Sequence, residues 1–186
     1  MSGAALTPQV GERDHAAGPV DAPVTLVEYG DYECPYCGMA HPIVQKLQNA
    51  LGKQLRFLFR NFPLNEAHPH ARIAAQAAEA AGAQGKFWEM HDMLFTHQDA
   101  LDRDDIMGYA KSIGVDAARL ARELDSGIYE KHVREDFRSG VKSGVNGTPS
   151  FFINGERYDG SWANQEAFLG TLREVASRDA KATSGA

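Results

Sequence analysis

The chain has 186 residues, 43% of them hydrophobic, and its formal net charge is -6 at pH 7. This length and apolar content suit one globular domain, or one domain carrying an insertion, with a substantial core. The acidic balance argues against a nucleic-acid partner, which calls for a basic excess, and the lack of an apolar run of roughly 20 residues argues against membrane insertion.

Residues 1–20 show no hydrophobic period and are interpreted as an extended or loosely held N-terminal extension. Their first eight residues have neither the basic nor the apolar region of a secretory signal. A cytoplasmic location is therefore expected if Met1 is the native start.

The next residues predict a strand, a helix and a second strand. Residues 24–29 are mostly apolar on both parities, which is typical of a central strand buried on both faces. A helical stripe follows from Pro35 and is closed by Gly52. Its members are Ala40, Ile43, Val44, Leu47 and Leu51. Residues 55–60 form the second strand, and a strand–helix–strand unit of this kind makes the two strands parallel.

Residues 66–143 are predicted to be a helical insertion, because no strand pattern interrupts them. An Ala-rich helix spans residues 71–83, and Asp102 and Asp116 are predicted N-caps of two later helices. The helix between residue 83 and Asp102 has one predicted face that consists of Phe87, His91, Leu94 and Phe95. The last helix of the insertion has an apolar stripe of Tyr129, Val133, Phe137 and Val141.

The C-terminal part predicts a hairpin and a helix. Residues 149–153 read as a strand, Asn154-Gly155 is a strong hairpin turn signal, and the chain returns over residues 156–158. Asn164 is the predicted N-cap of a helix with a core stripe. That stripe is Phe168, Leu172, Val175 and Ala176.

These elements predict an α/β domain made of residues 21–65 and 144–178 and split by the helical insertion at 66–143. Residues 179–186 are interpreted as a frayed tail.

Cys34-Pro35-Tyr36-Cys37 holds both cysteines of the chain, at the predicted start of a helix. A helix N-terminus stabilises a thiolate, so Cys34 is the predicted nucleophile and Cys37, one turn deeper, the resolving thiol. Two other interpretations stay open: a pair of inert core cysteines, or half of a metal site with His41 as a third ligand. A structural zinc ion needs four ligands, so redox chemistry is favoured and no metal site is predicted.

Glu28 is an acidic residue inside an otherwise apolar strand, where an unpaired charge would be costly. The hypothesis is that burial raises its pKa and that it relays a proton to or from Cys37. The alternative is a strand-end glutamate that reaches solvent.

The chain resembles the DsbA-like family of the thioredoxin-fold superfamily over roughly residues 18–178. The likeness is carried by residues 24–37, by the helical insertion, and by residues 147–155, which contain Thr148-Pro149. It implies a thioredoxin-like fold with an inserted all-helical subdomain, and a protein thiol–disulfide oxidoreductase. The Pro35-Tyr36 pair departs from the Pro-His of the strongly oxidising bacterial members and matches that of glutaredoxins.

The resemblance also implies roles for individual residues. Pro149 is cis and packs against the redox pair, although X–Pro bonds in general are mostly trans. Thr148 offers its backbone to an extended substrate, and Glu28 matches the buried acid of the family. Pro35 and Tyr36 tune the thiolate, and because neither is charged, a reduction potential of about −200 to −230 mV is predicted.

The expected partners are protein thiols or disulfides and a redox partner that recycles the site. The expected cofactor is none beyond the redox-active disulfide Cys34–Cys37. In a reducing cytosol the protein would act as a reductase or isomerase, and in an oxidising compartment the same site could donate its disulfide. Two alternatives are a glutathione-linked enzyme of the glutaredoxin or kappa-type transferase kind, and a non-catalytic peptide-binding module. Tyr32 and Glu33 are further candidates for lining the substrate groove, whereas His68 and His70 are interpreted as loop or helix-start residues.

Overall fold

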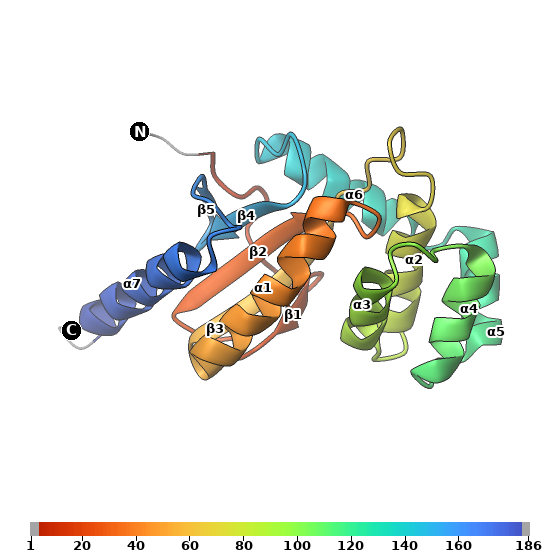
Figure 1. The fold of residues 1–186 in the computed structure, drawn as a ribbon, viewed down its shortest axis with the longest axis horizontal. Helices are drawn as coiled ribbons and strands as arrows, with labels where there is room; N and C mark the ends of the chain where they lie inside the picture. The colour runs from red at the N-terminus through yellow and green to blue at the C-terminus, as the bar shows by residue number, and fades with distance from the viewer. Residues whose placement is uncertain (1–3, 184–186) are drawn as a thin grey trace.

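The computed structural model describes the backbone of residues 4–183 and the side chains of residues 4–178. Within this part, a five-stranded sheet has the order β1-β3-β2-β4-β5, with helices on both sides (Figure 1). The strands are β1 (His15–Ala17), β2 (Val24–Gly30), β3 (Leu55–Asn61), β4 (Ser150–Ile153) and β5 (Glu156–Tyr158). The helices are α1 (Pro35–Leu51), the short 3-10 helix η1 (Gly52–Gln54), α2 (Ala71–Gly82), α3 (Phe87–Thr96), α4 (Arg103–Ser112), α5 (Ala117–Ser126), α6 (Glu130–Lys142) and α7 (Gln165–Thr183). The predicted α/β fold class is confirmed.

β2 lies at the centre of the sheet, parallel to β3 and antiparallel to β4. Successive side chains of a strand point to opposite faces. Leu26 therefore packs into the core beneath α1 and α7, whereas Val27 and Tyr29 pack into a second core against α6. Glu28 shares the face of Leu26, which places its carboxyl group in the layer between the sheet and α1.

α1 crosses over the sheet between β2 and β3 and is the element that carries both cysteines (Figure 1). Pro35 occupies its first turn, where the missing N–H costs nothing. Gly52 follows its last residue with φ 53°, a left-handed value that favours glycine. Both ends of the helix lie where the sequence predicts them.

Helices α2 to α6 all fall between β3 and β4 along the chain, as predicted for the insertion. α2 is at their centre and contacts α3, α4, α5 and α6. Its alanines are all buried, and their small side chains let four helices approach one axis. The boundaries of the insertion at residues 66 and 143 stay a prediction.

Of the two interpretations of residues 1–20, extended or loosely held, the second does not fit the described residues from position 4, which pack against the sheet. β1 pairs antiparallel with β3 and forms one edge of the sheet. Asp14 makes two hydrogen bonds of 2.7 and 2.9 Å to the buried guanidinium of Arg60, and Leu6 is 2% exposed. The pairing of β1 is hard to predict from the sequence because β1 has only three residues and its partners on β3 lie about 40 positions away.

Three helix predictions need correction. Val141, predicted in the apolar stripe of α6, is 55% exposed, because α6 buries the polar or small residues Asp136, Ser139 and Gly140 instead. Asp102 lies at the N-cap position of α4 but makes no capping bond, since its carboxylate pairs with His70. α7 continues to Thr183, beyond its predicted end at residue 178, while residues 184–186 of the predicted tail lie outside the described part.

Other local signals give the predicted structures. The Asp116 carboxylate accepts the Arg119 N–H at the start of α5, and Asn164 accepts the Ala167 N–H at the start of α7. Asn154 and Gly155 both have positive φ between β4 and β5, as a tight hairpin turn requires. Among the described residues, no helix is both long enough and apolar enough to cross a bilayer.

Candidate active site

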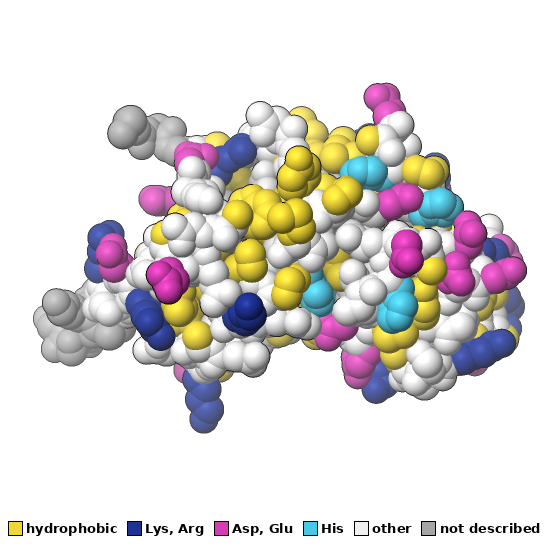
Figure 2. Space-filling view, in the orientation of Figure 1, with side chains coloured by type: hydrophobic (Ala, Val, Ile, Leu, Met, Phe, Trp, Pro, Cys, Tyr) yellow, Lys and Arg dark blue, Asp and Glu magenta, His cyan; other side chains and the backbone are white. Residues whose placement is uncertain are grey.

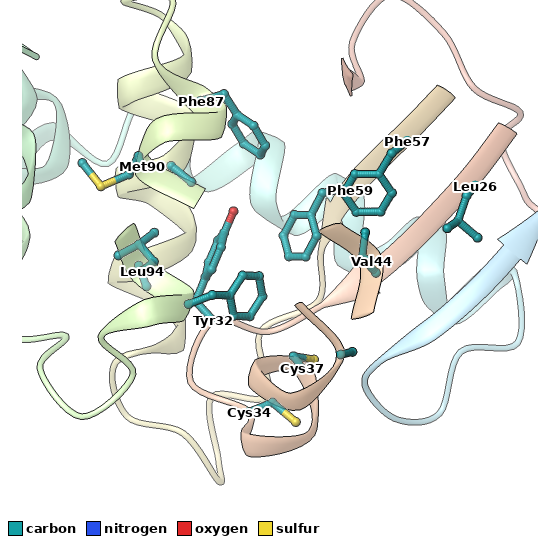
Figure 3. Close-up of a cluster of buried hydrophobic side chains, with 14 of the residues drawn as sticks. Leu26, Tyr32, Cys34, Cys37, Val44, Phe57, Phe59, Phe87, Met90 and Leu94 are labelled. Carbon is teal, nitrogen blue, oxygen red and sulfur yellow. The ribbon is translucent and has the colours of Figure 1, made fainter. Parts of the chain in front are cut away.

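Cys34 occupies the N-cap position of α1, and Cys37 lies one turn further along the helix (Figure 3). Both are free thiols. Figure 3 shows them at one end of the buried cluster that includes Val44 of α1 and Phe57 and Phe59 of β3. Cys37 is fully buried, and Cys34 is 4% exposed, which is less than expected for the predicted nucleophile. A substrate can therefore reach only a small part of the Cys34 side chain.

The two thiols have opposite acidities. A hydrogen bond from Cys37 is the largest factor that lowers the pKa of Cys34 to about 5, and the Thr148 side chain and the N–H groups of Cys37 and Tyr36 add to it. Burial, which acts against this, is outweighed. Burial is also the main factor that raises the pKa of Cys37 well above its ordinary value. At neutral pH Cys34 is thus a thiolate, and Cys37 keeps its proton and donates a hydrogen bond to the Cys34 sulfur.

Thr148 lies directly beside the Cys34 sulfur, and Pro149 is the next residue in the chain. The Cys34 thiol is 3.5 Å from the carbonyl oxygen of Thr148, and the Thr148–Pro149 peptide bond is cis. The hydroxyl of Thr148 is buried and has no hydrogen-bond partner. When Cys34 ionises it can no longer donate to the carbonyl, and the hydroxyl is then available to donate to the thiolate.

Glu28 is 2% exposed, so it does not reach solvent from the strand. Its neighbours across the sheet are Phe59 and Phe151, and its Oε1 has no hydrogen-bond partner. Burial, followed by the negative charge of Cys34, raises the pKa of Glu28 to about 8. The charge of Glu28 in turn contributes to the raised pKa of Cys37. An acid that titrates near neutral pH therefore lies close enough to both sulfurs to influence them.

Asp31 organises the loop before α1 and was not singled out in the sequence. It is 1% exposed. Its backbone N–H contacts the Cys37 sulfur at 3.5 Å, and its carboxylate accepts the N–H of Leu64 at 2.8 Å and contacts Nδ1 of His68 at 2.7 Å. It also accepts the Glu33 N–H two residues later, an Asx turn. The sequence feature that could have identified Asp31 is its position, as an acidic residue between a buried strand and a helix.

The residues beside Cys34 do not line a groove in the way predicted. Tyr32 is 1% exposed, and its hydroxyl contacts Nδ1 of the buried His91 at 3.0 Å. The Glu33 carboxylate accepts the N–H of His70 and contacts its ring nitrogen at 2.8 Å, so it is turned towards α2. His68 and His70 lie just before α2, as predicted, and serve as partners for the two acids of the active-site loop.

Gln98 clamps the start of α1 from the segment that follows α3. Its side-chain amide donates to the carbonyl oxygens of Tyr32 at 2.8 Å and Cys34 at 2.9 Å. Gly38 makes room for it, because a Cβ at position 38 would lie 2.0 Å from Gln98 Oε1. No local pattern in the sequence connects Gln98 with the cysteines.

Tyr36 and Met39 are the large apolar side chains exposed on the first turns of α1, at 62% and 58%. Figure 2 shows hydrophobic side chains gathered on the face of the molecule over this end of the helix. This apolar surface lies on the same end of α1 as Cys34.

His41 does not join the cysteines in a metal site. Its ring stacks on Phe95 at 5.0 Å, and the metal-capable group that contains it is completed by His91 and Asp92. Among the described residues, no such group includes a cysteine.

The chain matches a family model described as thioredoxin over residues 11–172. Its structure is similar to oxidised BdbD from Bacillus subtilis, with a TM-score of 0.83 and 25% identity, covering 95% of this chain and 100% of that one. It is also similar to a thioredoxin-like oxidoreductase from Silicibacter pomeroyi DSS-3, with a TM-score of 0.78 and 28% identity, covering 90% and 94% of the two chains.

A curated relative, the Na(+)/H(+) antiporter NhaA 1 of Salinispora arenicola, is 45% identical over 173 residues, which are 89% of this chain and 26% of the antiporter. The chain thus spans about a quarter of the length of the curated relatives it matches. The family model covers most of the chain, and the solved structures share its architecture over at least nine-tenths of its length. The chain belongs to the DsbA-like family of thioredoxin-fold proteins.

Proposed function

We propose that the protein exchanges a dithiol or disulfide at Cys34 and Cys37 with protein substrates, through a mixed disulfide at Cys34. The observation that carries this proposal is the asymmetry of the two thiols. Cys34, with a pKa of about 5, is ionised at neutral pH and lies beside Thr148, whereas Cys37 is buried and protonated. The Cys34 sulfur is thus suited to attack a substrate disulfide, and the Cys37 sulfur is suited to react only after the mixed disulfide has formed.

In the reducing direction, the Cys34 thiolate attacks one sulfur of a substrate disulfide, and the other sulfur leaves as a thiolate. Cys37 then loses its proton and attacks the Cys34 sulfur, which breaks the mixed disulfide and releases the second substrate thiolate. The substrate gains two electrons, and Cys34 and Cys37 become a disulfide. The oxidising direction is the reverse, and a separate redox partner removes or supplies the two electrons.

Glu28 is proposed to accept the proton of Cys37 during resolution. Attack requires the thiolate of Cys37, and its raised pKa makes this form scarce at neutral pH. A carboxyl group with a pKa of about 8 takes up and releases a proton in the same range. Because Glu28 has no hydrogen-bond partner for Oε1, this oxygen is free to receive it.

The direction of exchange follows from the site and from the compartment. A pKa of about 5 for Cys34 lies between the values of about 7 in thioredoxin and about 3.5 in DsbA. A less stabilised thiolate makes a weaker oxidant, and the uncharged Pro35 and Tyr36 agree with this. In a cytoplasmic location, the proposed role is a reductase or isomerase.

Trapping tests the proposal. In Cys37→Ser the mixed disulfide cannot be resolved, so proteins should accumulate covalently on Cys34 and be released by a reductant. Cys34→Ser/Cys37→Ser, the matched control, should capture none. If Cys37→Ser instead keeps full glutathione-dependent turnover, the protein is a glutathione-linked enzyme, and if Cys34→Ser keeps full activity, it is a binding module.

The ion transport in the names of the antiporter relatives belongs to proteins about four times as long as this chain. The proposed thiol exchange depends only on residues within the matched quarter. It therefore makes no use of that transport activity.

A further inference from the structure

A second group of titratable side chains lies where the N-terminal arm meets α2 and α6. It consists of His15 on β1, Glu79 on α2 and His132 on α6, and it shares no residue with the cysteine site. One nitrogen of each histidine and one oxygen of Glu79 lie within 4.8 Å of one another. The thiol chemistry gives this group no role.

The spacing of these atoms suits a metal ion. Glu79 Oε2 is 2.8 Å from His15 Nε2 and 3.6 Å from His132 Nε2. Ligand atoms at about 2.0–2.2 Å from a tetrahedral zinc ion are roughly 3.4 Å apart. Adjustments of a fraction of an ångström would bring the carboxylate oxygen to that separation from each nitrogen.

The surroundings hold the ligand atoms in place. The His15 ring stacks on Phe87, with centroids 3.7 Å apart and an angle of 8° between the planes. Position 82 is a glycine, and a Cβ there would lie 2.8 Å from Cε1 of His15. The Asn61 amide donates to Glu79 Oε1 at 2.8 Å, which fixes the carboxylate and leaves Oε2 facing the histidines. Outer contacts of this kind orient the ligands of metal sites.

The local charge also favours a cation. Glu79 is 4% exposed and Asp136 is 2% exposed, and the amide of Asn61 contacts both carboxylates. Arg13 pairs with Asp136, whereas no described arginine or lysine forms an ion pair with Glu79, whose Oε2 faces the two histidines. Asn61 Oδ1 is buried without a hydrogen-bond partner, so the hydrogen-bonding capacity of the polar groups here is not fully used. The side chains of His15 and His132 are about one quarter exposed, which leaves a path from solvent.

We propose that His15 Nε2, Glu79 Oε2 and His132 Nε2 bind a first-row transition-metal dication, in the first instance Zn²⁺, with water completing the coordination. Two imidazoles and one carboxylate are typical ligands of zinc, whereas calcium and magnesium prefer oxygen ligands alone. The ion would join the N-terminal arm to α2 and α6. The site was not predicted from sequence, because its three residues come from separate elements and share no motif.

The other metal-capable group of the described part of the chain, His41, His91 and Asp92, is a weaker candidate. His91 is buried among aromatic rings, and its Nδ1 is already in contact with the hydroxyl of Tyr32.

The test uses the full chain without a polyhistidine tag and with Cys34 and Cys37 oxidised, so that neither thiol can bind metal. Zn²⁺ is titrated by calorimetry, and Co²⁺ is followed by its visible absorption, which is stronger in four-coordinate sites. We expect one ion per chain and an increase in Tm with Zn²⁺. His132→Ala and Glu79→Gln should each weaken Zn²⁺ binding by about tenfold or more.

His97→Ala is the matched control, because His97 is an exposed histidine at the end of α3. It should leave binding and the Tm increase unchanged. Circular dichroism and the metal-free Tm show whether each variant is folded, and Glu79→Gln keeps the side-chain shape if His132→Ala does not fold. The proposal is overturned if wild type binds no Zn²⁺ at one-to-one stoichiometry, or if binding survives both His132→Ala and Glu79→Gln.

Discussion

The Cys34 sulfur lies 3.5 Å from the carbonyl oxygen of Thr148, although the two residues are 114 positions apart in the chain. This contact joins the start of α1 to the loop before β4. It places the polar atoms of Thr148 beside the sulfur that the helix start also stabilises.

Replacing the partners of Cys34 should raise its pKa. Cys37→Ala removes the largest stabilising hydrogen bond of the thiolate and should have the larger effect, and Thr148→Val removes only the hydroxyl and should have a smaller one. The pKa is measured from the ultraviolet absorption of the thiolate, or from the rate of alkylation, as a function of pH. Equal pKa values in wild type and Cys37→Ala would contradict the proposed hydrogen bond.

Reduction of the Cys34–Cys37 disulfide should make the free energy of unfolding depend more strongly on pH. The pKa of Cys34 is lowered from 9.0 to about 5 in the folded protein, so its contribution is complete above pH 9 and is lost as the pH falls through 5. The free energy of unfolding of the reduced protein should therefore rise, relative to the oxidised protein, by a few kcal/mol between about pH 5 and pH 9. Urea unfolding of both forms measures this difference. A constant difference across the range would show that the Cys34 thiolate is not stabilised.

Glu28→Gln should slow resolution of the mixed disulfide without preventing formation of the Cys34–Cys37 disulfide. The wild-type rate should rise with pH as Glu28 loses its proton, and the variant should lose this dependence. The midpoint should lie below the pKa of about 8 that Glu28 has beside the Cys34 thiolate, because Cys34 carries no charge in the mixed disulfide. The expected decrease is about a hundredfold or more. Release of a chromophoric thiol from Cys34 measures the rate, and Glu33→Gln controls for loss of a nearby charge. Identical pH profiles in wild type and Glu28→Gln would remove Glu28 from the mechanism.

Gln98→Ala should lower the free energy of unfolding by about 1–3 kcal/mol, because two hydrogen bonds to the start of α1 are lost. Gln48→Ala, the same change near the other end of α1, is the control and should have a much smaller effect. Gly38→Ala should destabilise wild type by displacing Gln98. In the Gln98→Ala background the same change should stabilise by up to about 1 kcal/mol, because alanine favours a helix. Additive effects of the Gly38 and Gln98 substitutions on the free energy of unfolding, measured in urea, would show that the Gln98 side chain does not pack against Gly38 at the start of α1.

Tyr36→His should make the site more oxidising. Position 36 is 62% exposed, so the fold should be unaffected, and a histidine can add positive charge near the Cys34 thiolate. The wild-type reduction potential is expected at about −200 to −230 mV, and that of the variant should be less negative. Equilibration against glutathione measures both, with Tyr36→Phe as the control. A wild-type value of about −120 mV would contradict the assignment of the Pro35-Tyr36 pair as weakly oxidising.

The sequence by itself determined the elements whose signals are local. The strand at β2, the stripe of α1, the caps at Asp116 and Asn164 and the Asn154-Gly155 turn all follow from periodicity or from the conformational preferences of neighbouring residues. The same local reasoning identified the two thiols, because their spacing and their place at a helix start are contained in four consecutive residues.

Only the tertiary structure decided which distant groups meet at those elements. The clamp by Gln98, the ion pair between Asp31 and His68, the pairing of β1 with β3 and the burial of Tyr32 each join parts of the chain that share no local pattern. Periodicity shows that a side chain faces the core, but not which side chain it meets there. That choice depends on how the sheet and helices pack, because a hydrogen bond or ion pair forms only when the complete fold brings both partners within about 3 Å.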